Sequence, residues 1–263
     1  MIKIALCIKQ VPDTNDIRWT EHNTIQREGV ESIINPYDVY ALEFALKIKQ
    51  ELKDVSITVF SMGPKQAQNI ISRAIALGAD DGVLISDKKF AGSDTYATAL
   101  ILSKAIEKVL PDYDLVICGQ FATDGDTAQT PPNIATFLNI AQVTFVKEFL
   151  KIEKESFWLK RELEDGLETV KVKSPAVIGV LKENFEPSRP RISGIITAAK
   201  KEIKVLGIDD LGLSSEQVGI KGSPTYVNKA FRKVTSHNAT KYIQDTQKSV
   251  EMIRDVIKST LGG

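Results

Sequence analysis

The sequence LVICGQFATDGDTAQTPP, residues Leu115–Pro132, is the stretch from which the fold is most readily predicted. Leu115–Cys118 is a short apolar run after a polar turn, which is typical of a buried strand, and Gly119 ends it. Small and polar residues follow until an apolar segment resumes at Ile134. A buried strand, a small-residue loop and a helix start together predict a βα unit of an α/β protein.

The loop of this unit has the composition of an anion-binding turn. Peptide N–H groups at a helix N-terminus point outward and carry partial positive charge, which favours a phosphate. Asp124 and Asp126 would repel a phosphate, so we expect them to hold the turn by bonding local N–H groups. Further donors are the hydroxyls of Thr123, Thr127 and Thr130 and the amide of Gln129.

Two other interpretations of this loop stay open at this point. A solvated βα turn accounts for the stretch equally well, because polar loops are the norm on protein surfaces. A calcium loop fits worse, since the twelfth position is Ala135, where a bidentate Glu is needed. The stretch is therefore a candidate nucleotide loop.

Composition narrows the class of protein. The 263 residues are 43% hydrophobic, and 34 basic residues balance 34 acidic ones. This neutrality argues against nucleic acid or an anionic membrane surface as the main partner. Cys7 and Cys118 fall in predicted buried strands, and two such cysteines fit a reducing compartment. No signal peptide or membrane-length apolar run is visible, so we expect a cytoplasmic protein without membrane insertion.

Strand and helix patterns alternate strictly before Leu115. Apolar strands are predicted at Ile2–Ile8, Val55–Phe60 and Gly82–Ile85, with helical spacing of apolar residues between them. This alternation predicts a mostly parallel, Rossmann-like sheet with right-handed crossovers and helices on both faces. Pro12 should end the first strand. Asn35-Pro36 should open the first helix, with Asn35 as its cap.

The pattern changes after Val143. Phe157–Leu163 and Glu168–Lys173 flank Asp165-Gly166, which predicts an antiparallel hairpin added to the sheet. Ala176–Leu181 is a further apolar strand. Lys182–Ile196 has two prolines and no periodicity, so it is predicted to be an exposed loop used in recognition.

The end of the chain is predicted to be an extension of the α/β domain. From Lys204 the chain has little with which to form a core of its own, and Lys241–Leu261 is predicted to be an amphipathic helix. Its apolar stripe would either cap this domain or clamp a partner subunit. We therefore divide the chain into a nucleotide-binding α/β domain, residues 1–200, and a C-terminal extension, residues 201–263.

Several standard motifs are absent. The sequence has no GxGxxG fingerprint and no GxxxxGK[ST] P-loop. No Cys/His cluster suits a metal, and no Ser or Cys lies in a recognisable nucleophile motif.

Taken together, several stretches resemble one family, the beta subunit of electron-transfer flavoprotein. The resemblance spans nearly the whole chain in the right order. The matching stretches are CIKQVPDT (Cys7–Thr14), INPYD (Ile34–Asp38), SMGP (Ser61–Pro64), ALGAD (Ala76–Asp80), ATDGDTAQ (Ala122–Gln129), DGLETVKVKSPAVIGV (Asp165–Val180) and RPRISGIITAAKKE (Arg189–Glu202).

The resemblance implies a heterodimer with a homologous alpha subunit, which the C-terminal extension, residues 201–263, is expected to contact. Ordinary members hold one FAD in alpha and a structural AMP in beta. A second branch holds a second FAD in beta and performs electron bifurcation: NADH reduces the beta flavin, one electron goes to ferredoxin or flavodoxin, and the other passes through the alpha flavin to a dehydrogenase. KQVPDT, INPYD and DGDTAQ look like this second branch. An alternative function from a different class of protein is an ATP-binding regulatory module of the universal-stress type, which shares the alternating α/β pattern.

The resemblance also implies which residues contact the nucleotide and the partner. We assign no catalytic acid or base, because hydride transfer to a flavin requires neither. An aliphatic anchor for the flavin dehydrogenase, of acyl-CoA or hydroxy-acid type, falls at Ile192. The implied nucleotide contacts are Cys7, Val11, Pro12, Asp13, Asn35, Pro36, Tyr37, Asp38, Met62, Gly119, Gln120, Phe121, Ala122, Thr123, Asp124, Gly125, Asp126, Thr127, Ala128, Gln129 and Thr130.

The chain departs from the second branch within the loop. Many of its members have Arg-Gln between the Gly and the Ala, where this chain has Gln120-Phe121. Their Val-Gly-Pro after the Gln is here Thr130-Pro131-Pro132. The missing Arg removes a charge partner for phosphate or flavin, which leaves the flavin environment open.

Overall fold

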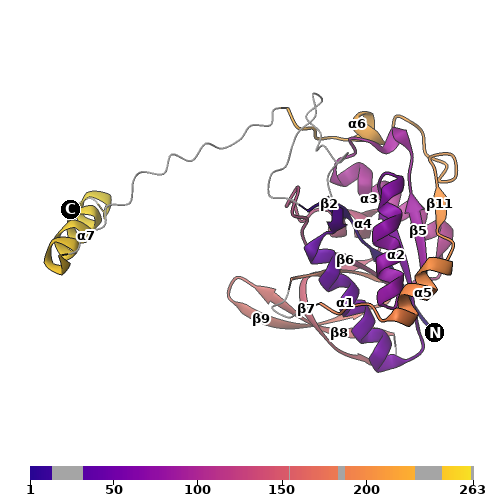
Figure 1. Cartoon of the computed structure of the whole chain (residues 1–263), viewed down its shortest axis with the longest axis horizontal. Helices are drawn as coiled ribbons and strands as arrows, with labels where there is room; N and C mark the ends of the chain where they lie inside the picture. The colour runs from indigo at the N-terminus through magenta and orange to yellow at the C-terminus, as the bar shows by residue number, and fades with distance from the viewer. Residues whose placement is uncertain (14–31, 154, 183–186, 229–244, 262–263) are drawn as a thin grey trace. The chain divides into compact units, whose positions relative to one another are not determined.

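The computed structural model describes residues 1–13, 32–153, 155–182, 187–228 and 245–261 (Figure 1). The chain divides into two compact units, Met1–Asn228 and Lys229–Gly263, which are treated separately below. Parts of three predicted segments lie outside the described residues: Thr14 of the first motif, residues 183–186 of the predicted recognition loop, and residues 241–244 of the predicted terminal helix.

The first unit is built on a nine-stranded sheet with the order β11-β5-β4-β1-β6-β10-β7-β8-β9. The strands from β11 to β7 are parallel, and β8 and β9 are antiparallel additions at one edge, which confirms the predicted mixed α/β fold. The strands are β1 Ile2–Cys7, β4 Val55–Met62, β5 Asp81–Ile85, β6 Leu115–Gly119, β7 Ala141–Glu153, β8 Ser156–Leu163, β9 Gly166–Lys173, β10 Ala176–Val180 and β11 Lys204–Leu206.

Helices cover both faces of this sheet, as predicted. The side chains of β1 alternate between the two sides: Ile4 and Leu6 belong to the apolar cluster that includes α1 and α2, whereas Ala5 and Cys7 belong to the cluster that includes α3 and α4. The helices are α1 Pro36–Leu52, α2 Gln68–Leu77, α3 Thr95–Val109, α4 Thr130–Leu138, α5 Ile192–Lys200 and α6 Gly219–Gly222, with short 3₁₀ turns η1 Lys65–Ala67 and η2 Lys88–Phe90.

Pro12 does not end the first strand in the way that the sequence suggested. The strand β1 stops at Cys7, and Pro12 closes a second short strand, β2 Gln10–Pro12, which pairs antiparallel with β3 Ser32–Ile34. This two-stranded sheet is separate from the main one. Proline is tolerated there because it is the last residue of a short edge strand.

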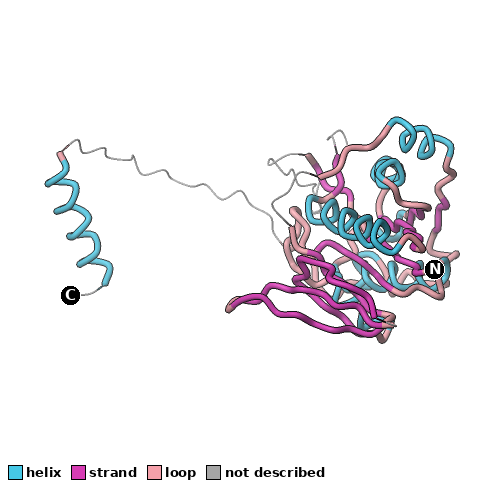
Figure 2. The backbone as a smooth tube through the Cα atoms, turned by 90° about the horizontal axis from the view of Figure 1, so that it is seen from below, coloured by secondary structure: helices cyan, strands magenta, loops and turns pink. Residues whose placement is uncertain are grey.

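The strand β7 was not predicted from the sequence. It carries many charged residues, and its pairing with β8 shifts register between Val146 and Glu148 and again between Phe149 and Lys151. Each shift breaks the period of two that reveals a half-buried strand. The predicted hairpin is confirmed, and Figure 2 shows its strands running out past the helices from the edge of the sheet.

The predicted loop Lys182–Ile196 is wrong at its end, because residues from Ile192 onward form α5. This helix packs beside α2 (Figure 1). Gly194 lies so close to α2 that a Cβ atom would be 2.1 Å from the carbonyl oxygen of Ala76. Its sequence, ISGIITAAK, has poor intrinsic helix propensity. Tertiary packing on α2 therefore stabilises a helix that local preference does not predict.

Residues beyond Lys204 complete the first unit. The strand β11 pairs with β5, and Leu206, Ile208, Leu211 and Val218 are buried in the apolar cluster of α3 and α4. These residues supply apolar surface to a core that the rest of the chain has already formed. The prediction that residues 201–263 contact an alpha subunit stays a prediction.

The second unit contains α7, Thr246–Leu261. Val250, Ile253 and Ile257 fall on one helical stripe and are exposed within the structure. The amphipathic helix is thus confirmed, and its role stays open. Among the described residues, no helix combines the length and apolar character that crossing a bilayer requires.

Candidate functional site

The predicted site residues gather at the carboxyl ends of two neighbouring strands. From β1 the chain continues through α1, β4, α2 and β5 on one side, and β6 then returns to pair with the other side of β1. The point where the strand order reverses therefore lies between β1 and β6. Open α/β sheets bind ligands at this position, outside the carboxyl ends of the strands.

Asp38 joins the two strand ends to the start of α1. Its Oδ2 accepts from the peptide N–H of Lys9 at 2.7 Å, and its Oδ1 accepts from that of Gly119 at 3.1 Å. A side chain at position 119 is excluded, since a Cβ atom would lie 2.4 Å from Asp38 Oδ1 and 2.8 Å from the backbone of Tyr37. Burial raises the pKa of Asp38 to about 7, against the lowering effect of these hydrogen bonds.

Asn35 is the N-cap residue of α1 and Pro36 begins the helix, as predicted, but the Asn35 side chain makes no capping hydrogen bond. Its Nδ2 donates to the carbonyl of Phe121 at 2.8 Å, and its Oδ1 accepts from the N–H of Thr123 at 3.2 Å. The prediction of a side-chain cap is therefore wrong, because the neighbouring loop offers this buried amide partners of both kinds. Asn35 instead fastens the loop after β6 to the start of α1.

Lys9 is a site residue that sequence analysis missed. Its Nζ lies 2.6 Å from Oδ1 of Asp124, whose side chain is only 3% exposed. The expectation that Asp124 bonds local N–H groups stays a prediction, and its side chain pairs with this cation from a segment more than 100 residues away. The pairing neutralises a charge that would otherwise repel a phosphate. The available signal was the position of Lys9, directly after the first strand and inside the motif KQVPDT.

The loop between Asp126 and Thr130 presents peptide N–H groups. Asp126 and Ala128 have φ of 50° and 56°, and Ala128 is followed by Gln129 with φ −94° and ψ −21°. Alternation between left- and right-handed conformations forms a concave row of N–H groups that suits an anion. The N–H groups of residues 127–130 have no hydrogen-bond partner among the described residues.

The start of α4 contributes less than expected from a helix N-terminus. Two of the three residues in its first turn, Pro131 and Pro132, have no N–H group, which leaves that of Thr130. The N–H groups that this loop can offer an anion are therefore mainly those of residues 127–130. This donor set suits a phosphate or diphosphate.

An aromatic cluster borders the loop. The ring of Phe121 lies 5.3 Å from that of Tyr37 and 6.0 Å from that of Phe145, measured between centroids. Phe145 has φ of 60°, and its N–H donates to the side chain of Gln120 at 2.9 Å. Gln120 was among the predicted contacts, but its side chain is buried and bonded within the sheet. The exchange of Arg-Gln for Gln-Phe thus places an aromatic ring beside the loop.

The remaining predicted contacts lie around the same strand ends. Cys7 and Cys118 are register partners on β1 and β6, and both are free and buried. The hydrogen bond with Cys7, together with burial, raises the pKa of the Cys118 thiol well above its usual value. Val11 and Pro12 are buried, Asp13 is exposed, and Met62 ends β4 half-buried.

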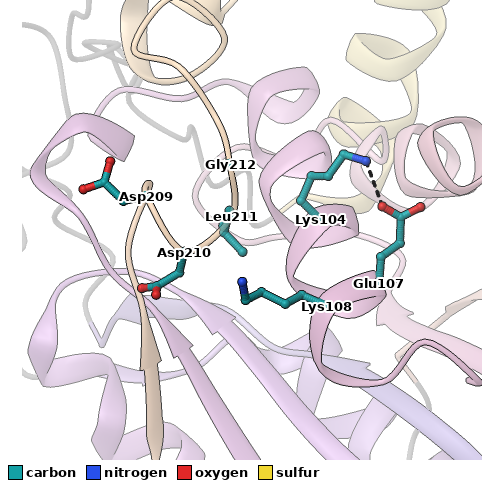
Figure 3. A pocket seen from close by; sticks show the side chains of 7 residues that line it. All are labelled: Lys104, Glu107, Lys108, Asp209, Asp210, Leu211 and Gly212. Atoms are coloured by element: carbon teal, nitrogen blue, oxygen red, sulfur yellow. Dashed lines mark hydrogen bonds and ion pairs between the residues drawn. The ribbon is translucent and has the colours of Figure 1, made fainter.

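A hollow of about 520 Å³ lies elsewhere, between α3 and residues 209–212 (Figure 3). The view shows Lys108 extending from the helix toward Leu211, while Lys104 pairs with Glu107 on the same helix. The hollow shares no residue with the strand-end site. It is lined by Lys104, Glu107, Lys108, Asp209, Asp210, Leu211 and Gly212.

Fold and site together define the class: a doubly wound α/β protein whose loop at the reversal of the strand order presents peptide N–H groups that suit an anion. The chain belongs to the electron transfer flavoprotein family, whose domain, described as "Electron transfer flavoprotein domain", matches residues 22–211. The family match therefore favours the flavoprotein interpretation over the alternative, a universal-stress-type module.

Similar proteins carry the name of the beta subunit. The chain is 49% identical to "Electron transfer flavoprotein subunit beta" of Thermoanaerobacterium thermosaccharolyticum, over 86% of both chains. It is 41% identical to the protein of the same name in Megasphaera elsdenii, over 88% of this chain and 87% of the relative. Identity is also 41% to "Caffeyl-CoA reductase-Etf complex subunit CarD" of Acetobacterium woodii, again over 88% and 87%.

Proposed function

We propose that this chain is the beta subunit of an electron-transfer flavoprotein and that residues 119–130 hold the phosphate portion of FAD. The observation that carries this proposal is the row of N–H groups in residues 127–130, at the reversal of the strand order, for which the described part of the chain supplies no hydrogen-bond partner. Lys9 neutralises Asp124 beneath the same loop, and Phe121 and Tyr37 supply aromatic surface beside it. Bound FAD would accept a hydride and pass on single electrons, while the chain supplies position and electrostatics.

The proposed reaction is electron bifurcation together with an alpha subunit in the cytoplasm. NADH delivers two electrons at the beta site; one leaves to ferredoxin or flavodoxin and the other passes through the FAD of alpha to a dehydrogenase. The motif resemblance supports this branch, as does the likeness to a subunit named for a caffeyl-CoA reductase–Etf complex. An AMP in place of the beta FAD is the alternative, because both nucleotides share the adenosine phosphate that this loop suits.

The dehydrogenase is proposed to dock at the start of α5. Ile192 is 78% exposed there, and Ile195 and Ile196 on the same helix are also exposed. Exposed aliphatic side chains clustered on one short helix are typical of a protein contact surface. We further propose that the C-terminal extension contacts the alpha subunit.

Nucleotide extraction tests the cofactor. The chain is expressed together with its alpha subunit, the heterodimer is purified, and the released nucleotides are quantified by chromatography. Two FAD per heterodimer support the bifurcating branch. One FAD and one AMP assign the chain to the single-flavin branch, and the absence of any nucleotide beyond that of alpha overturns the proposed site.

Coupled turnover tests the reaction. NADH oxidation is followed in the presence of ferredoxin alone, of the dehydrogenase with its substrate alone, and of both acceptors together. Bifurcation predicts that ferredoxin is reduced only when both acceptors are present, with one electron delivered to each branch. Full reduction of the dehydrogenase substrate without ferredoxin would contradict it.

A further inference from the structure

Asp38 lies where three segments of the candidate site meet. Its carboxylate accepts hydrogen bonds from the peptide N–H groups of Lys9, which follows β1, and of Gly119, which ends β6. The side chain of Asn35, which precedes α1, lowers the pKa of Asp38 against the larger effect of burial. Two peptide donors from two strand ends therefore engage one buried carboxylate.

The same three segments are tied together by further bonds around Asp38. The N–H of Asn35 donates to the carbonyl of Lys9 at 2.8 Å, and the side chain of Asn35 binds the backbone at Phe121 and Thr123. Lys9 in turn reaches Asp124. The carboxylate of Asp38 bonds both of the other segments, at Lys9 and at Gly119. We therefore expect the conformation of residues 119–124 to depend on it.

We propose that Asp38 is the positioning residue of the nucleotide site: its carboxylate holds the peptide groups of Lys9 and Gly119, and thereby sets the loop 119–130 in the conformation that binds the phosphate. It acts through the loop rather than by touching the ligand. The proposal rests on the proposed function, since it assumes that this loop carries a nucleotide.

The energetic cost of ionising the buried carboxyl group of Asp38 agrees with a functional role for this residue. A carboxyl group this deeply buried is costly to ionise, and burial raises its pKa to about 7. The ionised form offers acceptors to both N–H groups, whereas the protonated form places an O–H donor among donors. The charged group that faces Asp38 is Lys9, which pairs with Asp124; the titratable thiol of Cys118 also lies near, and its raised pKa keeps it neutral near pH 7.

The chain contains a matched control at the other end of the same strands. Asp114 precedes β6, and its Oδ2 accepts from the N–H of Lys3 in β1 at 2.8 Å, while its Oδ1 accepts from Ser174 at 3.2 Å. Asp114 thus also links β1 to β6 through a backbone bond, but away from the loop. Asp38→Asn and Asp114→Asn each remove one carboxylate from a comparable structural link.

The experiment uses the full chain as a heterodimer with its alpha subunit. The dissociation constant of the second nucleotide is measured by equilibrium dialysis against FAD, or against AMP if AMP is what extraction finds, from pH 6 to pH 8.5. Asp38→Asn should weaken binding at least tenfold at pH 8 and less than threefold at pH 6, whereas Asp114→Asn should stay within twofold of the wild type. Comparing variants at each pH cancels titration of the ligand.

Asp38→Glu keeps the charge and is the second variant. It should retain the rise of affinity with pH that Asp38→Asn loses. Wild-type affinity and pH profile in Asp38→Asn, or equal weakening in Asp114→Asn, would overturn the positioning role while the proposed function stands. A wild-type heterodimer that holds no second nucleotide would instead overturn the proposed function, and with it this inference.

Discussion

Asp38 makes the stability of the protein depend on pH. Its pKa is raised from an ordinary value near 4 to about 7 in the folded state, so the folded chain keeps this proton over a range in which the unfolded chain loses it. The contribution of Asp38 to the free energy of unfolding is therefore fully present below pH 4 and is lost as the pH rises to 7. The pKa difference corresponds to about 4 kcal/mol.

Replacement of this carboxyl group should flatten that dependence. We expect the free energy of unfolding of the wild type to fall between pH 5 and pH 7.5 relative to that of Asp38→Asn, because the variant has no group to ionise. Urea denaturation at a series of pH values measures the difference. Parallel curves for the two proteins would show that Asp38 does not titrate in this range.

Gly119 is required by its contacts. A Cβ atom there would meet the carboxylate of Asp38 and the backbone of Tyr37, and neither can move without disturbing the loop. We expect Gly119→Ala to lower the free energy of unfolding by about 1–3 kcal/mol, the usual cost of overpacking.

Gly125 supplies the control, since a Cβ atom would meet nothing within 4 Å and its φ is not left-handed. Gly125→Ala should leave the urea midpoint nearly unchanged. Equal midpoints for both variants would refute the steric argument at Gly119.

At the scale of elements, α5 is packed against the domain on one side and exposes apolar side chains on the other. One side of the helix is held against α2 through Gly194 and the buried Ala198, while Ile192, Ile195 and Ile196 stay exposed. Packing on one side thus presents apolar side chains on the other. A rigid helix orders such side chains at a lower entropic cost on binding than a flexible loop would.

Ile192→Asp should therefore weaken dehydrogenase docking without altering the fold. A substitution at an exposed position far from the core is expected to change the free energy of unfolding by no more than about 0.5 kcal/mol. We expect the dissociation constant for the dehydrogenase to rise at least tenfold, with the flavin content unchanged. Leu167→Asp, at the 61% exposed tip of the hairpin, is the control and should dock normally. Normal docking of Ile192→Asp would discard the anchor role.

At the scale of the whole molecule, the division of the chain predicts what truncation does. Residues 1–228 contain the nine-stranded sheet, both apolar clusters and the candidate site. A chain ending at Asn228 should therefore fold with a thermal transition close to that of the full chain, as followed by circular dichroism. If the extension contacts the alpha subunit, the truncated chain should copurify poorly with it; loss of the fold itself would contradict the division.

Much of the fold could be predicted because its signals are local. Apolar runs such as Leu115–Cys118, helical spacing and the Asp165-Gly166 turn all depend on neighbours in sequence. The strand β7 escaped prediction because register shifts interrupt its alternation, and α5 because its helix depends on packing against α2.

The sequence by itself determined the alternating α/β order, the loop at the end of β6 and the family to which its motifs belong. Only the tertiary structure decided how that loop is held: that the side chain of Asn35 bonds Phe121 and Thr123 rather than the N–H groups of α1, that Lys9 neutralises Asp124, and that Asp38 joins Lys9 to Gly119. The physical reason is that these bonds join residues about 30 to 115 positions apart. Such partners meet only when parallel strands place their carboxyl ends at the same edge of the sheet.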